Sequence, residues 1–573
     1  MATAASTGEG TAGSVTPPDR IDSDLLVLAE RARGWADLPL EDRIDQLRRL
    51  LRRTAGIGPR LVRACLAAKG VGGGFEGEEW VATVAVQLRA MRSLLHTLEG
   101  VQRHGRVPIA PRDIAVRGDG QVVIRVIPMD RWDRALFPGW RGEVWVDPGV
   151  TSDILDHHLG SFYTKPGPAD AGVAAVLGAG NVASIAPLDA IHMLFVSGMA
   201  VMVKFNPVNE YIGPFFEEAF SGLIEAGFVR CAYGGAGTGS YLAHHPLVDR
   251  VHLTGSSATL DALVYGGGEG GASRRADGKA ILTKPVTSEL GNVGPVIVVP
   301  GRWSDRQLRY QAEHLATQIM QNAGFNCIAA RVVVMPRGWE QGGDFLGHLR
   351  RVLAGLMPRP AYYPGAVDRW EALVASHPGT EVVGPLGNGV LPPALLMGVD
   401  PEADHPAFRE EAFCPATVVT GLDAPDAASF LEAAVGFCNH RLAGTLNATI
   451  LVDPETAAIL GDPLADAVAG LRYGSVGVNV WGGASYALGT TPWGGFPGAG
   501  GAGTVGGSGF VHNTRLIDRP QKTVLYGPFV QVPKPGWFLT HRNGNRAMRR
   551  YAAFEADPGL RRFLAAAAAS IRG

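Results

Sequence analysis

Cys327 is the strongest candidate nucleophile in this sequence. It ends the run QNAGFNC at residues 321–327, an Asn-x-Gly-x-x-Cys pattern, and small apolar residues follow it at 328–330. A thiol is a strong nucleophile wherever its surroundings favour the thiolate. The alternative is a structural thiol, because most lone cysteines pack in a core. Only 5 cysteines occur in 573 residues, so one in a glycine-containing bend between a helix and an apolar strand suggests a chemical role.

Strands and helices that alternate along the chain would position this cysteine. Apolar β-type runs and amphipathic runs follow one another from residue 173 onward, which is the pattern of a parallel sheet wrapped by helices. The pattern predicts strands at 173–177, 200–204, 228–233, 251–254, 295–299 and 330–335, and helices at 186–199, 211–226 and 304–320. Cys327 falls between the last helix and the last strand.

The residues before this region combine helices with isolated strands. Apolar residues at helical spacing predict a helix around 40–51. The same pattern and short apolar runs predict helices at 61–68 and 78–98, strands at 121–127 and 143–146, and loops at 131–142 and at the glycine-rich insert 266–271.

Glycine-rich turns follow several predicted strands, at 178–181, 234–239 and 254–256. In a parallel sheet the ligand lies beyond the carboxyl ends of the strands, with phosphates against helix N-termini. One such turn is weak evidence, since any tight turn uses glycine. Three on successive strands favour a nucleotide-type cofactor.

Composition excludes several classes of protein. Lys+Arg 52 against Asp+Glu 54 gives a net charge of -2 without a basic block, so we expect no nucleic-acid partner. Scattered cysteines without a Cys/His ligand pattern argue against a disulfide scaffold and a metal site, and they fit a reducing cytoplasm. No apolar run reaches the ~18 residues of a membrane span. Residues 1–18 lack a basic start and an apolar core, so we expect a disordered lead-in there and no secretory signal.

Several separated motifs resemble those of the aldehyde dehydrogenase superfamily, in that family's order, over roughly residues 35–527. Each match is modest alone, and together they identify the chain as similar to a divergent member. The matching segments are QNAGFNC at 321–327, SELGNVGP at 288–295, GN at 180–181 with VK at 203–204, VDRVHLTGS at 248–256, EEAFCP at 410–415, GSVGVN at 474–479 and PWGG at 492–495.

The resemblance implies a chemistry for three residues. Cys327 would attack an aldehyde carbon to form a thiohemiacetal, and a thioester would follow after loss of a hydride. The side-chain amide of Asn181 and the backbone N–H of Cys327 would stabilise the oxyanion. Glu289 would act as general base on the water that releases the acid. The alternative for Glu289 is an ordinary exposed carboxylate.

The resemblance also implies a bound NAD or NADP. Lys204 would reach the adenosine ribose, although a solvated strand end is its alternative. Glu411 would hold the nicotinamide ribose, and Phe413 would pack nearby unless it is a core aromatic. The helix opened by Gly255 and Ser256 suits a pyrophosphate. The full set of implied cofactor residues is Lys204, Gly235, Gly239, Gly255, Ser256, Leu290, Glu411 and Phe413.

Departures from the family pattern fall around the cofactor and the substrate. Ala179 and Gly180 replace the usual Pro-Trp, so the wall of the substrate tunnel should differ. Pro207 replaces the acid that often follows the lysine by three residues, which leaves NAD and NADP both open.

The sequence therefore favours NAD(P)-dependent oxidation of an aldehyde to a carboxylic acid. A CoA-acylating aldehyde dehydrogenase or acyl-CoA reductase is the first alternative, and Glu289 speaks against it because acylating relatives tend to lack that base. A non-catalytic protein that keeps the fold is the second alternative, since the cofactor motifs are eroded.

The predicted fold is α/β and aldehyde dehydrogenase-like, with a Rossmann-type cofactor domain, an α/β catalytic domain and a β oligomerisation arm. By resemblance we expect a homo-oligomer, either a dimer or a tetramer. The predicted divisions are a lead-in at 1–20, the helical part of the cofactor domain at 21–150, arm segments at 151–170 and 506–528, the Rossmann-type domain at 171–290, the catalytic domain at 291–505 and a C-terminal extension at 529–573.

Overall fold

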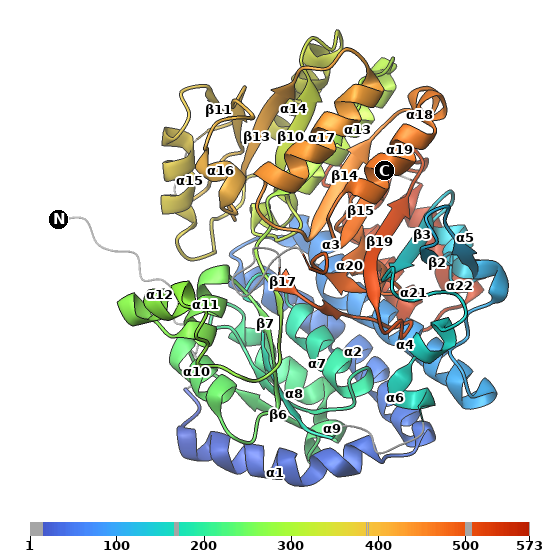
Figure 1. Ribbon diagram of the computed structural model, residues 1–573, viewed down its shortest axis with the longest axis vertical. Coiled ribbons are helices and arrows are strands. Elements are labelled where there is room, and N and C mark those ends of the chain that lie inside the picture. Colours follow the sequence, from blue (N-terminus) through green and yellow to red (C-terminus); the bar gives the residue numbers. More distant parts are fainter. Residues whose placement is uncertain (1–14, 166–170, 386, 388, 499–506, 572–573) are drawn as a thin grey trace.

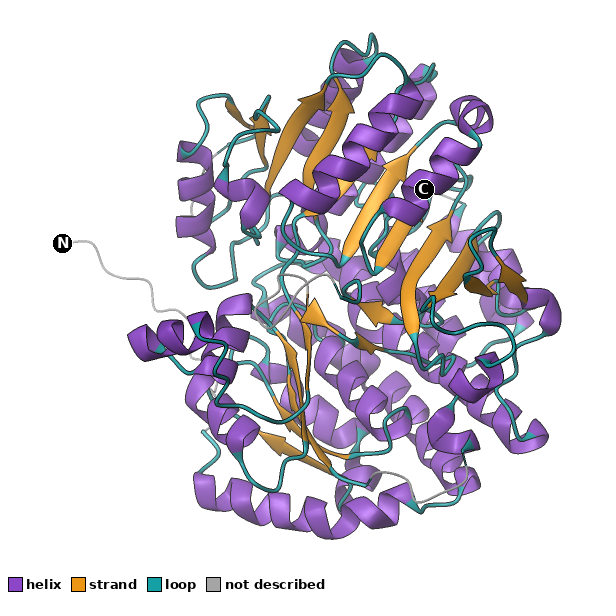
Figure 2. Cartoon of the chain, in the orientation of Figure 1, coloured by secondary structure: helices purple, strands orange, loops and turns teal. Residues whose placement is uncertain are grey.

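Two β-sheets with helices on both faces form the centre of the structure (Figure 1, Figure 2). The structure is a computed structural model that describes residues 15–165, 171–385, 387, 389–498 and 507–571. No helix in these described ranges is long and apolar enough to cross a membrane.

The smaller sheet has the strand order β17-β8-β7-β4-β5-β6, and its strands are parallel except for β17 at one edge. The chain enters at β4, builds outward through β5 and β6, and then returns to the other side of β4. This reversal places a topological switch point between β4 and β7, where parallel α/β sheets bind ligands. The strands are β4 (Val173–Leu177), β5 (Ala200–Lys204), β6 (Val229–Ala232), β7 (Arg250–Thr254), β8 (Val286–Glu289) and β17 (Gly507–Ser508).

The larger sheet has the order β1-β2-β3-β19-β15-β14-β9-β10-β13-β12-β11. In this spatial order, the strands from β19 through β12 are parallel to one another. Strand β11 at one end and the β1–β3 ribbon at the other end pair antiparallel. Its strands are β1 (Ile114–Val116), β2 (Val122–Ile127), β3 (Arg141–Val146), β9 (Gly294–Val298), β10 (Ala330–Pro336), β11 (Thr380–Val382), β12 (Ala394–Met397), β13 (Ala416–Leu422), β14 (Asn447–Leu451), β15 (Ser475–Val478) and β19 (Pro520–Tyr526). A separate ribbon pairs β16 (Trp493–Gly494) with β18 (Phe510–Val511).

Helices cover the faces of both sheets, and α1 runs beneath the smaller one in Figure 1. Those around the smaller sheet are α1 (Pro18–Ala36), α7 (Ile185–Phe195), η5 (Glu210–Ile212), α8 (Gly213–Ala219), α9 (Ser221–Glu225), α10 (Ala236–His244), α11 (Ser257–Tyr265) and α12 (Gly268–Ala276). Those that follow along the larger sheet are α13 (Asp305–Met320), η6 (Gln321–Gly324), α14 (Gly342–Gly355), α15 (Ala366–Ala375), α16 (Pro406–Arg409), α17 (Ala427–Arg441), α18 (Pro454–Leu460), α19 (Asp462–Gly470) and α20 (Ala484–Leu488).

Helices from the two ends of the chain pack together beside β2 and β3 (Figure 1). The N-terminal and connecting ones are α2 (Leu40–Ala68), η1 (Gly73–Phe75), α3 (Glu76–Glu79), η2 (Trp80–Ala85), α4 (Val86–His104), η3 (Pro111–Asp113), α5 (Arg131–Leu136), η4 (Leu155–His158) and α6 (Ser161–Thr164). The C-terminal ones are α21 (Gly544–Ala556) and α22 (Leu560–Ser570).

The α/β alternation predicted from the sequence is confirmed. The strands at 173–177 and 200–204 match residue for residue, and the other predicted strands between 228 and 335 agree within about two residues at each end. The helix before Cys327 starts at a capping box, in which Ser304 and Gln307 satisfy each other's backbone N–H groups.

Two predicted helices and two predicted loops are wrong. Residues 61–68 continue α2 and form no separate helix, since the buried face runs past Pro59. Residues 211–226 form η5, α8 and α9, with a break at Phe220, whose ψ of 6° leaves the helical range. The helix predicted at 78–98 is confirmed as α3, η2 and α4, and the π-helical turn η2 within it was not predicted.

Both predicted loops contain a helix, α5 in the first half of 131–142 and α12 in most of 266–271. Asp130 caps α5 by accepting bonds from the N–H groups of Trp132 and Asp133. Most of the insert 266–271 lies in α12, where Arg274 donates to the carbonyl of Tyr265 and ties this helix back to α11.

The predicted arm segments meet other parts of the chain. Strand β19 lies between β3 and β15 in the larger sheet, and Leu159 bridges Ile517. Residues 114–146, which fall in the predicted helical part of the cofactor domain, contribute β1–β3 to that same sheet. The domain boundaries themselves stay predictions.

Candidate active site

The bend before Cys327 is held in an unfavourable backbone conformation. Asn322 and Ala323 both have φ of 55° and Gly324 has φ of 76°, so three consecutive residues are left-handed. The left-handed conformation costs about 1–2 kcal/mol for each residue that carries a Cβ. Such strain persists only where surrounding contacts fix it, and it is typical of functional sites.

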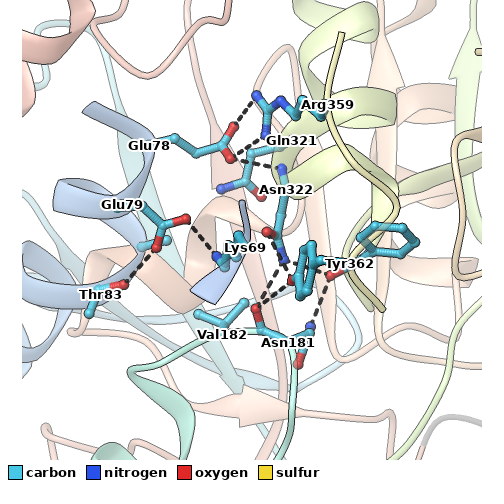
Figure 3. Close-up of polar contacts among 12 residues, drawn as sticks. Lys69, Glu78, Glu79, Thr83, Asn181, Val182, Gln321, Asn322, Arg359 and Tyr362 are labelled. Carbon is cyan, nitrogen blue, oxygen red and sulfur yellow. Dashed lines mark hydrogen bonds and ion pairs between the residues drawn. The ribbon is translucent and has the colours of Figure 1, made fainter. Parts of the chain in front are cut away.

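Polar contacts from distant segments fix this bend (Figure 3). The backbone N–H of Asn322 donates to Oε1 of Glu78 over 3.1 Å, and Glu78 is held in turn by both guanidinium nitrogens of Arg359, at 2.5 and 2.8 Å. The side-chain amide of Asn322 donates to the carbonyl of Asn181 at 3.0 Å, and Tyr362 donates to its Oδ1 at 3.2 Å. The bend is therefore clamped from α3 and from the loop after α14.

A buried arginine supports the bend from the side of the larger sheet. Arg331 on β10 donates to the carbonyl of Cys414 at 2.5 Å and to the carbonyls of Gly324 and Asn326. Burial lowers the pKa of its guanidinium, and the negative charge of Glu411 opposes that shift. Arg331 thus fixes the backbone on both sides of Phe325.

The Cys327 thiol and the Glu289 carboxyl are in direct contact. Glu289 ends β8 and is 2% exposed, and the Cys327 Sγ donates to its Oε1 over 3.1 Å. Burial raises the pKa of the Cys327 thiol well above its usual value, and the negative charges of Glu289 and Glu411 raise it further. Burial also raises the pKa of Glu289, while the bond from Cys327 opposes that shift. The resting pair is therefore a neutral thiol beside a base that can accept its proton.

The second oxygen of Glu289 is available for another donor. Oε2 is buried and has no hydrogen-bond partner among the described residues. A buried carboxylate oxygen without a partner is costly, and such an atom usually marks a place for water or ligand. A water bound to Oε2 would contact the same carboxyl group that accepts the hydrogen bond from the Cys327 thiol.

Asn181 lies beside the bend before Cys327, and its side chain is hydrogen-bonded to that bend. It is 5% exposed, and its Nδ2 donates to the carbonyl of Phe325 over 3.2 Å. Nδ2 of Asn181 carries a second N–H, which this hydrogen bond does not use. The predicted oxyanion role of Asn181 stays a prediction.

The carboxyl ends of the parallel strands bring most predicted cofactor residues to one edge. Lys204 ends β5, Gly235 is the residue before α10, and Gly255 and Ser256 lie between β7 and α11. Burial lowers the pKa of Lys204 to about 8, with Glu210 opposing. A Cβ on Gly235 would meet nothing within 4 Å, so the space above this helix start is open. The two helix N-termini and the lysine suit an anionic, phosphate-bearing ligand.

Glu411 reaches the same edge from the larger sheet's side. A Cβ on Gly291, just after β8, would lie 2.6 Å from Glu411 Oε2. Its Oε1 is buried and has no hydrogen-bond partner within the described ranges, and burial raises the pKa of Glu411 to about 7. This carboxyl oxygen near Cys327 can accept a hydrogen bond from a ribose hydroxyl. Glu411 and the residues at the strand ends therefore fit the predicted dinucleotide.

The remaining predicted cofactor residues mainly pack. Leu290 is 1% exposed and belongs to the core around the smaller sheet. Gly239 lies within α10, and its Cβ position is 3.9 Å from Leu177. Phe413 has φ of 41° and its ring packs on Tyr363 at 4.8 Å between centroids. For these three the structure shows packing contacts, and a ligand contact stays a prediction.

The departure at Gly180 has a structural reason. A Cβ there would lie 2.7 Å from Oδ1 of Asn206 and 3.1 Å from the hydroxyl of Tyr363. These two groups already fill the space beside Gly180, so a bulky side chain there would displace them.

Sequence reasoning missed the residues that clamp the bend. Glu78 and Arg359 carry no local signature, since each is an unremarkable charged residue 200 or more positions from the other. Arg331 did leave a signal, because a basic residue stands alone in the apolar strand AARVVVMP. No group of His, Cys, Asp or Glu side chains in the described part of the chain is arranged to hold a metal ion.

A cavity of about 340 Å³ opens in front of Cys327 and Glu289. Its walls include Trp481, Tyr486 and Trp493 near the sulfur, and its far side is formed by residues after 530. This size is typical of a small-molecule site. The arrangement can bind an uncharged molecule and present one of its atoms to the thiol.

Part of the chain is similar in sequence to aldehyde dehydrogenases. The sequence model of the aldehyde dehydrogenase family matches residues 156–349. "Aldehyde dehydrogenase LUC3" of Fusarium sp is 26% identical over 155 residues, which are 26% of this chain and 30% of that protein. "4-Trimethylaminobutyraldehyde dehydrogenase A" of Danio rerio is 31% identical over 157 residues, which are 26% of this chain and 28% of that protein. The matches thus span less than a third of each curated relative.

Solved structures resemble the chain over most of its length. An aldehyde dehydrogenase of Mycobacterium tuberculosis complexed with NAD+ has a TM-score of 0.61 at 17% identity, covering 90% of this chain and 92% of that one. The NADP-dependent glyceraldehyde-3-phosphate dehydrogenase of Bacillus halodurans C-125, complexed with NADP, has a TM-score of 0.59 at 15% identity, covering 88% and 91%. At such identities these likenesses show a common fold.

Proposed function

We propose that this chain, a divergent member of the aldehyde dehydrogenase superfamily, oxidises an aldehyde to the carboxylic acid with NAD or NADP as acceptor. The observation that carries the proposal is the 3.1 Å contact between the Cys327 thiol and the Glu289 carboxylate. It joins a nucleophile to a base in the lining of a cavity.

In the first half-reaction, Glu289 takes the thiol proton and the sulfur attacks the aldehyde carbon, giving a thiohemiacetal. The carbonyl oxygen becomes an oxyanion, which the backbone N–H of Cys327 and the Asn181 amide can stabilise. Collapse of the oxyanion expels the aldehyde hydrogen with its electron pair and leaves a thioester on Cys327. A nicotinamide cofactor supplies the acceptor for that hydride, and Lys204, Ser256 and Glu411 are the residues that would hold it.

In the second half-reaction, water attacks the thioester. Before this step Glu289 releases the thiol proton to solvent. The carboxylate then accepts the proton of the attacking water, and its Oε2 has no other partner among the described residues. The products are the carboxylic acid and the regenerated thiol. This base favours water over CoA as the acyl acceptor. Assembly into a dimer or tetramer and a cytoplasmic location stay predictions from the resemblance.

The proposal is tested with a panel of aldehydes, with NAD and NADP and with and without CoA, by following nicotinamide absorbance for wild type and Cys327→Ala. We expect acid formation without CoA by the wild type and loss of it in the variant. Strict dependence on CoA, or turnover that survives in Cys327→Ala, would refute the proposal. Absence of binding of either cofactor by calorimetry would favour a non-catalytic protein.

A further inference from the structure

The C-terminal segment after residue 530 forms one side of the cavity at Cys327. The cavity extends from the sulfur past α20 to the loop before α21 and to both C-terminal helices. In Figure 1 these helices lie beside α4 and α5. Side chains of the segment that line the cavity include Pro535, Trp537, Met548, Tyr551, Phe563 and Ala567. The end of the chain therefore belongs to the wall of the candidate active site.

Close backbone approach anchors the start of α21. Asn545 accepts the N–H of Gly77 at 2.7 Å and donates to the carbonyl of Gly73 at 2.8 Å. A Cβ on Gly77 would lie 2.8 Å from the backbone of Asn545, so only glycine permits this approach. The segment is thereby joined to the same turn of chain that carries Glu78.

A buried charge network anchors the end of α21. Glu555 is fully buried and pairs with Arg89 at 3.2 Å and Arg92 at 2.7 Å, and Arg89 also pairs with Asp133 at 2.9 Å. Phe563 of α22 then packs on Trp132 with 5.5 Å between ring centroids. These contacts fix both helices against α4 and α5, so the wall is part of the folded structure.

The charged and polar side chains in this wall already have partners. Lys534 is the single basic side chain among the described residues that line the cavity, and it donates to Glu313 and to the carbonyl of Thr540, both at 3.0 Å. Gln531 accepts the indole N–H of Trp140 at 3.0 Å. The lining thus offers no free cation to bind a carboxylate or a phosphate on a substrate.

We propose that α21 and α22 close an apolar tunnel that selects an uncharged alkyl aldehyde. The inference rests on the proposed function and adds the substrate class to it. The cavity of about 340 Å³ is large enough for an extended alkyl group. The substrate class is therefore an uncharged alkyl aldehyde, with the carbonyl at Cys327 and the alkyl end against α22.

Ala567→Phe, with Ala568→Phe as its matched control, tests this wall. Both alanines lie on α22, but Ala567 lines the cavity whereas Ala568 is exposed and outside its lining. For the wild type, kcat/KM should rise about threefold to fourfold for each added methylene until the alkyl chain fills the cavity. Ala567→Phe should lower kcat/KM for decanal at least about tenfold and leave propanal within about twofold. Ala568→Phe should leave both nearly unchanged.

Binding of n-alkanols, followed by tryptophan fluorescence, gives a readout that does not require turnover. Affinity should rise with chain length in the wild type and in Cys327→Ala, and Ala567→Phe should abolish that rise. Chain-length-dependent alkanol binding without aldehyde oxidation would contradict the proposed function and support the tunnel. Oxidation that prefers propanal or a carboxylated aldehyde, with alkanol binding independent of chain length, would overturn the tunnel and leave the proposed function standing.

Discussion

Replacing Glu78 by alanine tests whether the polar clamp holds the nucleophile bend. Its side chain is 8% exposed and pairs with an equally buried Arg359, so its removal leaves an uncompensated buried charge. Breaking such a pair costs about 3–5 kcal/mol of folding free energy. The N–H of Asn322 also loses a charged acceptor, a bond worth about 1.5–3 kcal/mol. The left-handed bend can then relax, and a shift of about 1 Å at a reacting atom can cost about 100-fold in rate.

The assay is urea unfolding together with kcat/KM for Glu78→Ala, Arg359→Met and the double variant. The double variant should be more stable than Glu78→Ala, because no unpaired charge remains. Its kcat/KM should stay low, since the N–H of Asn322 still lacks its acceptor. Glu76→Ala is the matched control, because Glu76 lies on the same short helix and bonds only to the Trp80 indole among the described contacts. Wild-type stability and kcat/KM in Glu78→Ala would refute the clamp.

Three further predictions concern charges in and around the site. In Glu289→Gln the loss of a negative charge should move the pH profile of Cys327 alkylation by iodoacetamide to lower pH, because that charge helps to raise the thiol pKa; a profile moved to higher pH would contradict the coupling. Because the pKa of Glu411 is raised to about 7, the carboxylate that can accept a ribose hydroxyl forms as pH rises towards that value. NAD(P) should therefore bind more tightly at pH 7 than at pH 5.5 by calorimetry, a range in which Lys204, with a pKa of about 8, keeps most of its charge. Glu411→Gln should weaken binding about tenfold or more and remove that pH dependence; an unchanged pH dependence would exclude Glu411 from the cofactor site. Glu555→Gln should lower the free energy of unfolding, measured with urea, by about 3–5 kcal/mol. Asp557→Asn, which breaks an exposed pair with Arg562, should lower it by about 1 kcal/mol or less. Equal losses of stability would show that the buried network does not anchor α21.

The sequence was sufficient for the parts of the fold that depend on local patterning. Buried parallel strands such as 173–177 and 200–204 are continuous apolar runs, and their ends are marked by glycine or by Lys204, so their limits were readable. Helix breaks were not readable in the same way. The π-helical turn η2 and the break at Phe220 depend on packing against distant helices, which periodicity does not report.

The same distinction applies to the candidate site. Cys327 and Glu289 lie in motifs, and the structure brings them into contact although they are 38 residues apart. Glu78 and the wall formed by α21 and α22 come from segments hundreds of residues away from Cys327, and Arg359 lies in a nearer loop that carries no motif. The close approach of Gly77 to Asn545 and the pairing of Glu78 with Arg359 bring these segments together at the site. The type of reaction could thus be predicted from the sequence, whereas the shape of the substrate site required the fold.

The acyl group on Cys327 is the most direct test of the mechanism. Wild-type protein is mixed with decanal and NAD or NADP, quenched in acid during the first turnover, digested, and analysed by mass spectrometry. The account predicts an adduct on the peptide that contains Cys327, with the mass of the aldehyde less two hydrogen atoms, and no adduct in Cys327→Ala. An acyl adduct on another residue, or first-turnover acid formation by Cys327→Ala, would contradict it.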